Sequence, residues 1–409
     1  MNGTSSDRQW SADSGQTSGA PIALRWGGCI APSDSHQRRR TRAAPLRAIP
    51  MDLVACVDLA PFLHDGASTE ARAACAEVAR SLRDTGIVLL RNPRLSDATS
   101  SHFLDMLEDY FAQDDAVKLA DERPRLHYQV GTTRGGVEVP LPRSAACAAR
   151  INAMPIEHRP TKVEGADPKW RFFWRIGQRP DGALYENLNA APVTPAAFPA
   201  WATTMDRWGA LLLDAVTACA EMASLGLGLP RGAISSLMHH GPHLLAPTAS
   251  DLSKHTQVGQ PLAGWHSDLN LLTIHGKSRY PGLYVWLRGG TKVAVAVPDG
   301  CLLVQAGQQL EYLTAGHIQA GMHEVVVTDT ALAIAGQAAF DGRPPWRISS
   351  TLFAHVASGL PLAPLPPFAA RREAAAYPPI TAGEQVLAAL TKIQLCVTPV
   401  RAPPPAVGL

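Results

Sequence analysis

The sequence predicts a mainly β domain with flanking helices, and three observations lead to this class. Residues 261–356 contain short β-like runs separated by Gly and Pro, which is typical of a sandwich or barrel. Residues 51–260 are expected to be largely helical, because several segments carry apolar residues at helical spacing. Thr381 and Glu384 form a capping box that opens a further helix. The expected layout is a helical part, a β core and a C-terminal helical brace over residues 357–396.

Composition and charge indicate a single globular domain over residues 51–396. The chain has 409 residues, of which 46% are apolar and 18% charged, and its net charge is +2. A balance this close to neutral gives no electrostatic reason to expect a nucleic acid or a membrane surface as a partner. The most apolar stretch, residues 211–229, is interrupted by Asp214 and Glu221, so no membrane span is expected. These features predict no particular oligomeric state.

The seven cysteines are scattered and never form C-x-x-C, which indicates reduced thiols in a cytoplasmic protein. Residues 1–50 are rich in Ser, Gly, Ala and Arg and lack the apolar core of a secretory signal. They are predicted to be a disordered segment, with an organellar transit peptide as the alternative. Residues 397–409 are Pro-rich and are predicted to be a flexible tail.

In the N-terminal part, each expected element has a local reason. Ser68 can cap a helix over residues 69–85, whose apolar positions follow the i, i+3, i+4 pattern, and Gly86 suits its end. Buried strands are expected at residues 53–57 and 87–90. Two further helices with apolar stripes are expected at residues 99–113 and 205–224.

The β core is predicted from six runs of residues that favour strands. A helix expected over residues 328–340 separates the last two runs. The helix that begins at Thr381 is expected to end near Gln394. The six runs are residues 265–275, 282–287, 292–297, 301–306, 322–327 and 346–356.

The motif H-x-D…H indicates a metal site. Side chains alternate faces along a strand, so His266 and Asp268 point the same way and can reach one ion together. His323 begins a later β-like run that is expected to lie across the barrel and to complete the set. Two histidines and a carboxylate leave one face of the metal open, as in non-haem Fe(II) oxygenases. His275 and His317 remain alternatives for the third position.

Another strand carries side chains suited to binding an anion. Arg347 and Ser349 share one strand face, followed by Thr351 and Phe353 on the same side. An arginine can pair bidentately with a carboxylate while the hydroxyl adds a third hydrogen bond. An ordinary structural salt bridge is the alternative for this pair.

Two segments are candidate substrate contacts. Alternation along residues 169–175 places Phe172 and Trp174 on one face and Arg175 on the other, which could form a pocket wall with an arginine that steers an anionic substrate. An edge strand with snorkelling arginines fits equally well. His127 and Tyr128 precede a Gly-rich segment and are weaker candidates, as is Phe353. The cluster His239, His240 and His243 has no matching carboxylate and is interpreted as structural.

The order of these motifs resembles the iron- and 2-oxoglutarate-dependent dioxygenases of the isopenicillin N synthase-like group. The resemblance covers roughly residues 52–356 and includes the metal motif, Val297-Pro298, Leu303-Val304, Arg347-x-Ser349 and the early segment from Cys56 to Leu89. It implies a distorted double-stranded β-helix, or jelly roll. It also implies that His266, Asp268 and His323 bind Fe(II), and that Arg347 and Ser349 bind the 2-oxoglutarate carboxylate.

The resemblance implies an oxidoreductase that uses O2 and 2-oxoglutarate to hydroxylate, desaturate or cyclise a small molecule. An iron oxidase that dispenses with 2-oxoglutarate is the first alternative, and a non-catalytic jelly-roll binding protein is the second. The chain departs from the family's pattern at Gln308, where an acidic residue is usual, and at Glu324, where arginine is frequent. It also separates His323 from Arg347 by 24 positions. The co-substrate site is therefore expected to require that these two strands remain neighbours.

Overall fold

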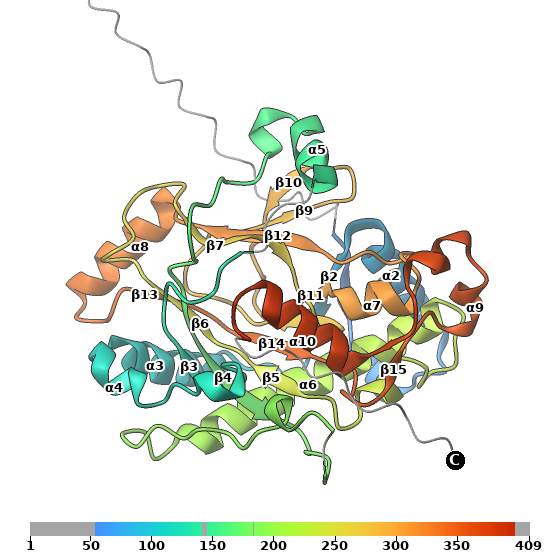
Figure 1. The fold of residues 1–409 in the computed structure, drawn as a ribbon, viewed down its shortest axis with the longest axis horizontal. Coiled ribbons are helices and arrows are strands. Elements are labelled where there is room, and N and C mark those ends of the chain that lie inside the picture. Colours follow the sequence, from blue (N-terminus) through green and yellow to red (C-terminus); the bar gives the residue numbers. More distant parts are fainter. Residues whose placement is uncertain (1–53, 141–144, 183, 397–409) are drawn as a thin grey trace, which may run out of the picture. The chain divides into compact units, whose positions relative to one another are not determined.

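The structure of this protein is a computed structural model, and it describes residues 54–140, 145–182 and 184–396. These residues belong to one compact unit, Leu46–Leu409. The leader or disordered segment expected at residues 1–50 and the tail expected at residues 397–409 lie outside the described residues. Within the described part, a mixed arrangement of two larger sheets and surrounding helices (Figure 1) confirms the predicted sheet-rich class with flanking helices.

The predicted helices form close to their expected bounds. Helix α2 spans Thr69–Thr85, and its first turn is capped by Ser68, whose hydroxyl accepts a hydrogen bond from the Ala71 N–H. Gly86 ends this helix with a φ of 82°, a left-handed conformation that glycine adopts without a steric penalty. The other predicted helices are α3 (Asp97–Ala112), α6 (Trp201–Gly226), α8 (Asp329–Phe340) and α10 (Ala382–Lys392).

Helices α1, α4, α5, α7 and α9 were not predicted. They are short segments, which carry too few turns for a periodic pattern to stand out. Their bounds are Ala60–His64, Asp115–Leu119, Ala145–Ala153, Gln308–Leu313 and Pro366–Ala369.

Helix α6 is long and apolar enough to cross a membrane if length and composition alone are considered. Within the fold, 56% of its most apolar window is buried. Its side chains Trp208, Leu212 and Val216 belong to the main hydrophobic core together with residues of α2 and α3. The helix is therefore packed as a core helix, and its apolar character is explained by that packing.

The larger sheet has ten strands in the order β1-β2-β11-β8-β14-β5-β4-β6-β13, with β3 paired to β4. Its strands are β1 (Cys56–Asp58), β2 (Ile87–Arg91), β3 (Gly131–Thr133), β4 (Trp170–Ile176), β5 (His243–Leu245), β6 (Thr248–Asp251), β8 (Leu272–His275), β11 (Cys301–Ala306), β13 (Trp346–Ser349) and β14 (Thr351–Ala354). Six of these strands precede residue 261. The sheet thus extends well into the part expected to be largely helical. Strands β5 and β6 were not predicted there, because strands this short give little signal in the sequence.

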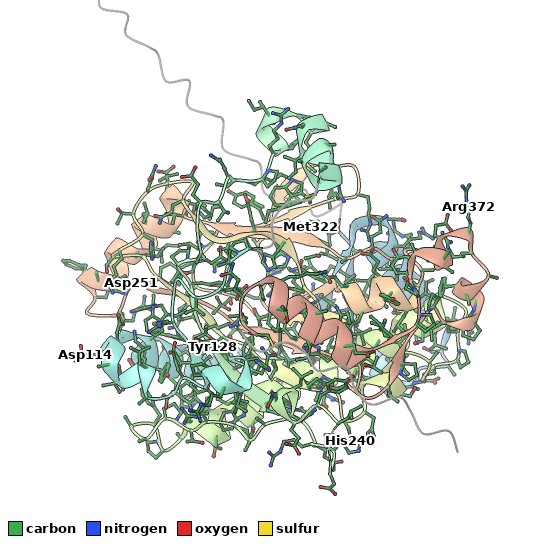
Figure 2. The ribbon with its side chains drawn as sticks, viewed as in Figure 1. Asp114, Tyr128, His240, Asp251, Met322 and Arg372 are labelled. Atoms are coloured by element: carbon green, nitrogen blue, oxygen red, sulfur yellow. The ribbon has the colours of Figure 1, made fainter. Side chains whose placement is uncertain are left out.

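A second sheet has the order β10-β9-β12-β7, which places β7 at an edge. Its strands are β7 (Pro261–Ser267), β9 (Leu283–Trp286), β10 (Lys292–Ala294) and β12 (Met322–Val326). Strands β15 (Pro361–Leu362) and β16 (Ile380–Thr381) form a separate pair that leads into α10. Met322 on β12 and Asp251 at the end of β6 mark the two larger sheets in Figure 2.

The connection between His323 and Arg347 differs from the expectation. Strand β12 pairs with β7 and β9, whereas β13 pairs with β6 in the other sheet. The two strands are therefore not neighbours, and α8 is the connection that carries the chain from one sheet to the other. The long gap between the two motifs is explained by this crossing between sheets. The expectation that a shared site requires neighbouring strands was wrong, because His323 of β12 and Arg347 of β13 line one cavity from different sheets.

Candidate metal centre

Three side chains with metal-binding atoms come together at the end of β7. The ligand atoms of His266, Asp268 and His323 all lie within 4.8 Å of one another. Among the described residues, no other group of three or more His, Cys, Asp or Glu side chains is placed to share an ion. Strand β12 lies directly beside β7 in antiparallel register, with His323 opposite His266. His323 thus reaches the site as a cross-strand neighbour, not from across a barrel as expected.

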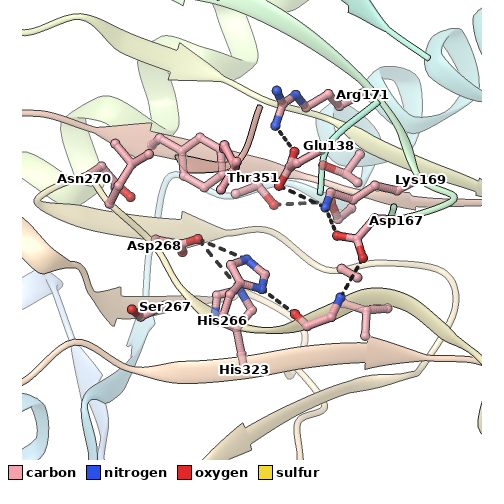
Figure 3. Close-up of a pocket in the computed structure, with 18 of the residues that line it drawn as sticks. Glu138, Asp167, Lys169, Arg171, His266, Ser267, Asp268, Asn270, His323 and Thr351 are labelled. Carbon is pink, nitrogen blue, oxygen red and sulfur yellow. Dashed lines mark hydrogen bonds and ion pairs between the residues drawn. The ribbon is translucent and has the colours of Figure 1, made fainter. Parts of the chain in front are cut away.

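Hydrogen bonds orient two of these side chains. Nδ1 of His266 lies 2.6 Å from the carbonyl oxygen of Gly264 and must donate to it, so the proton is on Nδ1 and Nε2 is free to bind a metal. The hydroxyl of Thr273 donates to Oδ2 of Asp268 at 2.6 Å. The other carboxylate oxygen, Oδ1, faces Nε2 of His266 at 3.6 Å and Nε2 of His323 at 3.8 Å (Figure 3).

Burial and mutual charge shift the protonation of all three groups. Burial by itself would raise the pKa of Asp268, but the two imidazoles and the Thr273 hydroxyl lower it overall. Burial lowers the pKa of His323 to about 3, so its ring is neutral. Burial also opposes protonation of His266, yet the Asp268 carboxylate raises its pKa. The set is therefore an ionised carboxylate beside imidazoles whose Nε2 atoms face it.

This donor set fits a divalent transition metal. The Oδ1–Nε2 distances are beyond direct hydrogen bonding and are short enough for the atoms to share one ion, since metal–nitrogen bonds measure about 2.0–2.1 Å. Two imidazoles and one carboxylate are the facial ligands of non-haem Fe(II) sites. A buried ionised carboxylate is stable when it is paired or coordinates a metal, and a cation held between Asp268 and the two imidazoles would meet this requirement. The residues present are thus suited to hold Fe(II).

The metal-binding atoms open into a cavity of about 190 Å³ between the two sheets. It is lined by Arg347 and Ser349 of β13 and by Thr351 and Phe353 of β14. These four side chains therefore face the same way, as predicted, although Ser350 separates the two strands. The Arg347 side chain is 6% exposed and donates from Nε to the Pro281 carbonyl at 3.1 Å. No carboxylate of the described residues forms an ion pair with it. Burial alone lowers its pKa to about 10.

A cluster of buried charges forms another wall of the cavity (Figure 3). Nζ of Lys169 contacts the carboxylate of Asp167 and lies 3.2 Å from Oε1 of Glu138. Arg171 pairs with the second oxygen of Glu138. The two positive and two negative charges balance, so this wall carries no excess charge. Lys169 and Arg171 lie in the run singled out at residues 169–175, whereas Glu138 and Asp167 were not predicted, because they precede β4 in loops without a motif.

Strand β4 faces the cavity with the side that carries its basic residues, which is one of the two faces named as a candidate pocket wall. Lys169, Arg171 and Phe173 line it, whereas Phe172 and Trp174 belong to the main hydrophobic core. Alternation correctly indicated two faces, but aromatic character did not tell which face points inward. Phe172 packs against Trp201 with ring centroids 4.6 Å apart, and the Trp174 indole donates to Asp206 at 2.7 Å.

Three other candidate substrate contacts also lie outside the cavity lining. Arg175 is buried and donates to the Ile176 and Gln178 carbonyls. His127 lies 3.2 Å from the Asn187 amide, and both His127 and Tyr128 have positive φ, of 54° and 55°. Gln129 lines the cavity in their place. Of the six predicted substrate contacts, Phe353 alone lines it.

The remaining histidines have other partners. His275 lines the cavity and interacts with Thr351 and Gln305, at 3.0 Å and 2.8 Å, but it does not belong to the metal-binding group. His317 stacks on Phe368 with ring centroids 5.5 Å apart. His243 accepts a hydrogen bond from the His355 N–H at 3.1 Å, in agreement with a structural role.

Comparisons with known proteins identify the fold. No protein-family model matches the chain, and neither does any curated protein. A crystal structure assigned to the 2OG-Fe(II) oxygenase family, from Caulobacter crescentus, matches with a TM-score of 0.64 and 21% identity over 83% of this chain and 99% of that one. A full-length Neurospora crassa protein, solved in complex with alpha-KG, has a TM-score of 0.62 and 18% identity over 82% and 95% of the two chains.

JOX2, solved in complex with 2OG, Fe and JA, matches with a TM-score of 0.58 and 18% identity over 85% of this chain and 88% of that one. At such identities the comparisons establish a shared fold. The chain therefore has the fold of the 2-oxoglutarate- and iron-dependent oxygenases, the superfamily that the order of its motifs resembles.

Proposed function

We propose that this protein is an Fe(II)- and 2-oxoglutarate-dependent dioxygenase that oxidises a small molecule. One observation carries the proposal: a two-histidine, one-carboxylate set opens into the same cavity as a buried arginine that has no carboxylate partner among the described residues. The fold supports it, because the Neurospora crassa protein was solved with alpha-KG and JOX2 with 2OG and Fe. We further propose that the two sheets form a distorted jelly roll around this cavity.

The proposed roles of the residues follow from their positions. His266, Asp268 and His323 would hold Fe(II), with Thr273 keeping one oxygen of Asp268 turned toward the imidazoles. Arg347 and Ser349 would bind the distal carboxylate of 2-oxoglutarate, since a guanidinium fork and a hydroxyl suit that group. The walls of the cavity would exclude water from the reacting groups. When bound, Fe(II) and 2-oxoglutarate supply O2 activation, with succinate as the co-product.

The substrate would lie on the side of the cavity formed by α10 and the charged cluster. Ala389, Leu390 and Ile393 offer apolar surface, and Glu138 and Lys169 offer polar atoms. The capping box at Thr381 fixes the start of α10: the Glu384 N–H donates to the Thr381 hydroxyl at 3.2 Å, and the Thr381 N–H donates to the Glu384 carboxylate at 2.8 Å. This combination fits a small molecule with an apolar body and a polar edge.

Co-substrate turnover tests the proposal. Purified protein with Fe(II), ascorbate and 2-oxoglutarate is expected to form succinate and consume O2, faster when a substrate from a metabolite panel is present. Fe(II) binding without any 2-oxoglutarate binding would instead indicate a 2-oxoglutarate-independent iron oxidase. Absence of Fe(II) binding, with no effect of His266→Ala, Asp268→Ala or His323→Ala, would indicate a non-catalytic binding protein and overturn the proposal.

A further inference from the structure

The strand that carries the first metal-binding residue is interrupted next to it. Strand β7 lies at the edge of its sheet, so only one side of its backbone pairs with a neighbour. The register with β12 shifts there, and Gly264 and Trp265 together oppose a single residue, Glu324. Such a bulge leaves backbone groups without ladder partners and bends the strand. The orientation of His266 therefore depends on what holds this bulge.

The carboxylate of Asp167 satisfies the backbone at the bulge. The Gly264 N–H donates to Oδ1 of Asp167 at 3.1 Å, and the carbonyl of the same glycine accepts from Nδ1 of His266 at 2.6 Å. Two hydrogen bonds, one from the N–H and one to the carbonyl of Gly264, thus connect Asp167 to the His266 imidazole (Figure 3). The contact is close: a Cβ atom at Gly264 would lie 2.9 Å from Cγ2 of Val163.

Asp167 is itself rigidly held. Its N–H donates to the Glu138 carbonyl at 3.0 Å, and its carbonyl accepts from the Gly136 N–H at 2.8 Å. Its side chain is 4% exposed and pairs through its other oxygen with Lys169, which also contacts the Glu138 side chain. The backbone and the ion pair therefore fix the carboxylate before it contacts the bulge.

We propose that Asp167 is a positioning residue for the metal centre. It fixes the Gly264 peptide, which in turn holds His266 with Nδ1 protonated and Nε2 turned toward Asp268 and His323. Asp167 does not bind the metal, since it lies outside the metal-binding group. The inference rests on the proposed function, in that the three ligands bind Fe(II). Outer-sphere partners of ligating histidines commonly change metal affinity by about 10–100-fold.

A purely structural role for Asp167 makes a different prediction. If Asp167 only stabilised the edge strand, its loss would lower the stability of the metal-free protein and leave the affinity of the folded protein for metal unchanged. Metal affinity and the metal's spectrum must therefore be measured separately from stability.

The experiment compares Asp167→Ala, Asp167→Asn and the control Glu164→Gln. Glu164 lies on the same segment, but its side chain is 79% exposed and pairs with the equally exposed Lys162. Dissociation constants for Mn(II) and Fe(II) come from competition with a chelator, the ligand field from Co(II) absorption, and stability from melting of the metal-free proteins.

Asp167→Ala is expected to weaken metal binding by about 10–100-fold and to change the Co(II) spectrum. Asp167→Asn is expected to lose less, because its amide oxygen can still accept from Gly264, and Glu164→Gln is expected to match the wild type. Unchanged metal affinity and an unchanged Co(II) spectrum in Asp167→Ala would overturn the inference, even if that variant melts at a lower temperature. Failure of the wild-type protein to bind any of the three metals would overturn the proposed function as well.

Discussion

Replacement of Arg347 by methionine tests how the cavity binds its co-substrate. Arg347 is buried, and within the part of the chain that the structure describes its side chain makes one hydrogen bond, from Nε to the Pro281 carbonyl, so the terminal nitrogens remain for a ligand. Methionine keeps much of the side-chain volume and removes the charge. We therefore expect the metal-free variant to be as stable as the wild type or more stable, because an unpaired buried charge is unfavourable.

The affinity for 2-oxoglutarate should change in the opposite direction. Each charge-assisted hydrogen bond contributes about 1.5–3 kcal/mol, so loss of a bidentate pair removes about 3 kcal/mol at the low end. Since about 1.4 kcal/mol corresponds to a factor of ten, affinity should fall at least about 100-fold. Arg347→Lys keeps the charge but loses the fork, and it should fall about 10-fold if one of the two bonds is lost.

Calorimetric titration of the Mn(II)-loaded proteins with 2-oxoglutarate measures these affinities. The affinity for Mn(II) itself should be unchanged in both variants, because no hydrogen bond or ion pair joins Arg347 to the three metal-binding residues. A 2-oxoglutarate affinity for Arg347→Met equal to that of the wild type would refute the assignment of this arginine. Stability of the metal-free proteins in denaturant provides the second, independent readout.

Three further predictions concern the metal site and the charged wall. Alanine at His266, Asp268 or His323 should reduce Fe(II) affinity by more than the roughly 10–100-fold typical of outer-sphere changes. Competition with a chelator measures this affinity. Wild-type affinity in any one of the three variants would exclude the substituted residue from the set of metal ligands. Thr273→Val should weaken Fe(II) binding within that range, because Oδ2 of Asp268 loses its 2.6 Å hydrogen bond, and an unchanged affinity would contradict this role.

The third prediction concerns pH. Burial would raise the pKa of Glu138, but Lys169 and Arg171 lower it from 4.5 to about 2. The ionised Glu138 side chain therefore stabilises the fold above pH 4.5, and this contribution is lost as the pH falls toward 2. The unfolding free energy of Glu138→Gln should therefore lie below that of the wild type near neutral pH and approach it in acid; a difference independent of pH would contradict this explanation.

Local patterns predicted much of the fold because their causes are local. The cap at Ser68 and the left-handed Gly86 bound α2 at the predicted residues, and β11 spans the predicted residues 301–306. Strands β5 and β6 were not predicted, because their places are fixed by pairing with distant strands: β5 with β14, and β6 with β13. Such pairing has no local signal in a short strand.

The sequence by itself determined the chemistry that the site can carry. Strand alternation is a local property, so it placed His266 with Asp268, and Arg347 with Ser349 and Phe353, on common faces. Tertiary structure decided which faces meet. It set His323 beside His266 through the β12–β7 register and put Arg347 in the opposite sheet.

Tertiary structure also turned the basic face of β4 inward and its aromatic face toward the core. The charged wall of Glu138, Asp167, Lys169 and Arg171 exists only in the folded chain, since Glu138 in a loop pairs with Lys169 and with Arg171 of β4, which is 33 positions away. Side chains brought together by long-range folding leave no periodic pattern in the sequence. The metal-binding residues could therefore be predicted from the chain alone, whereas the wall that surrounds them could not.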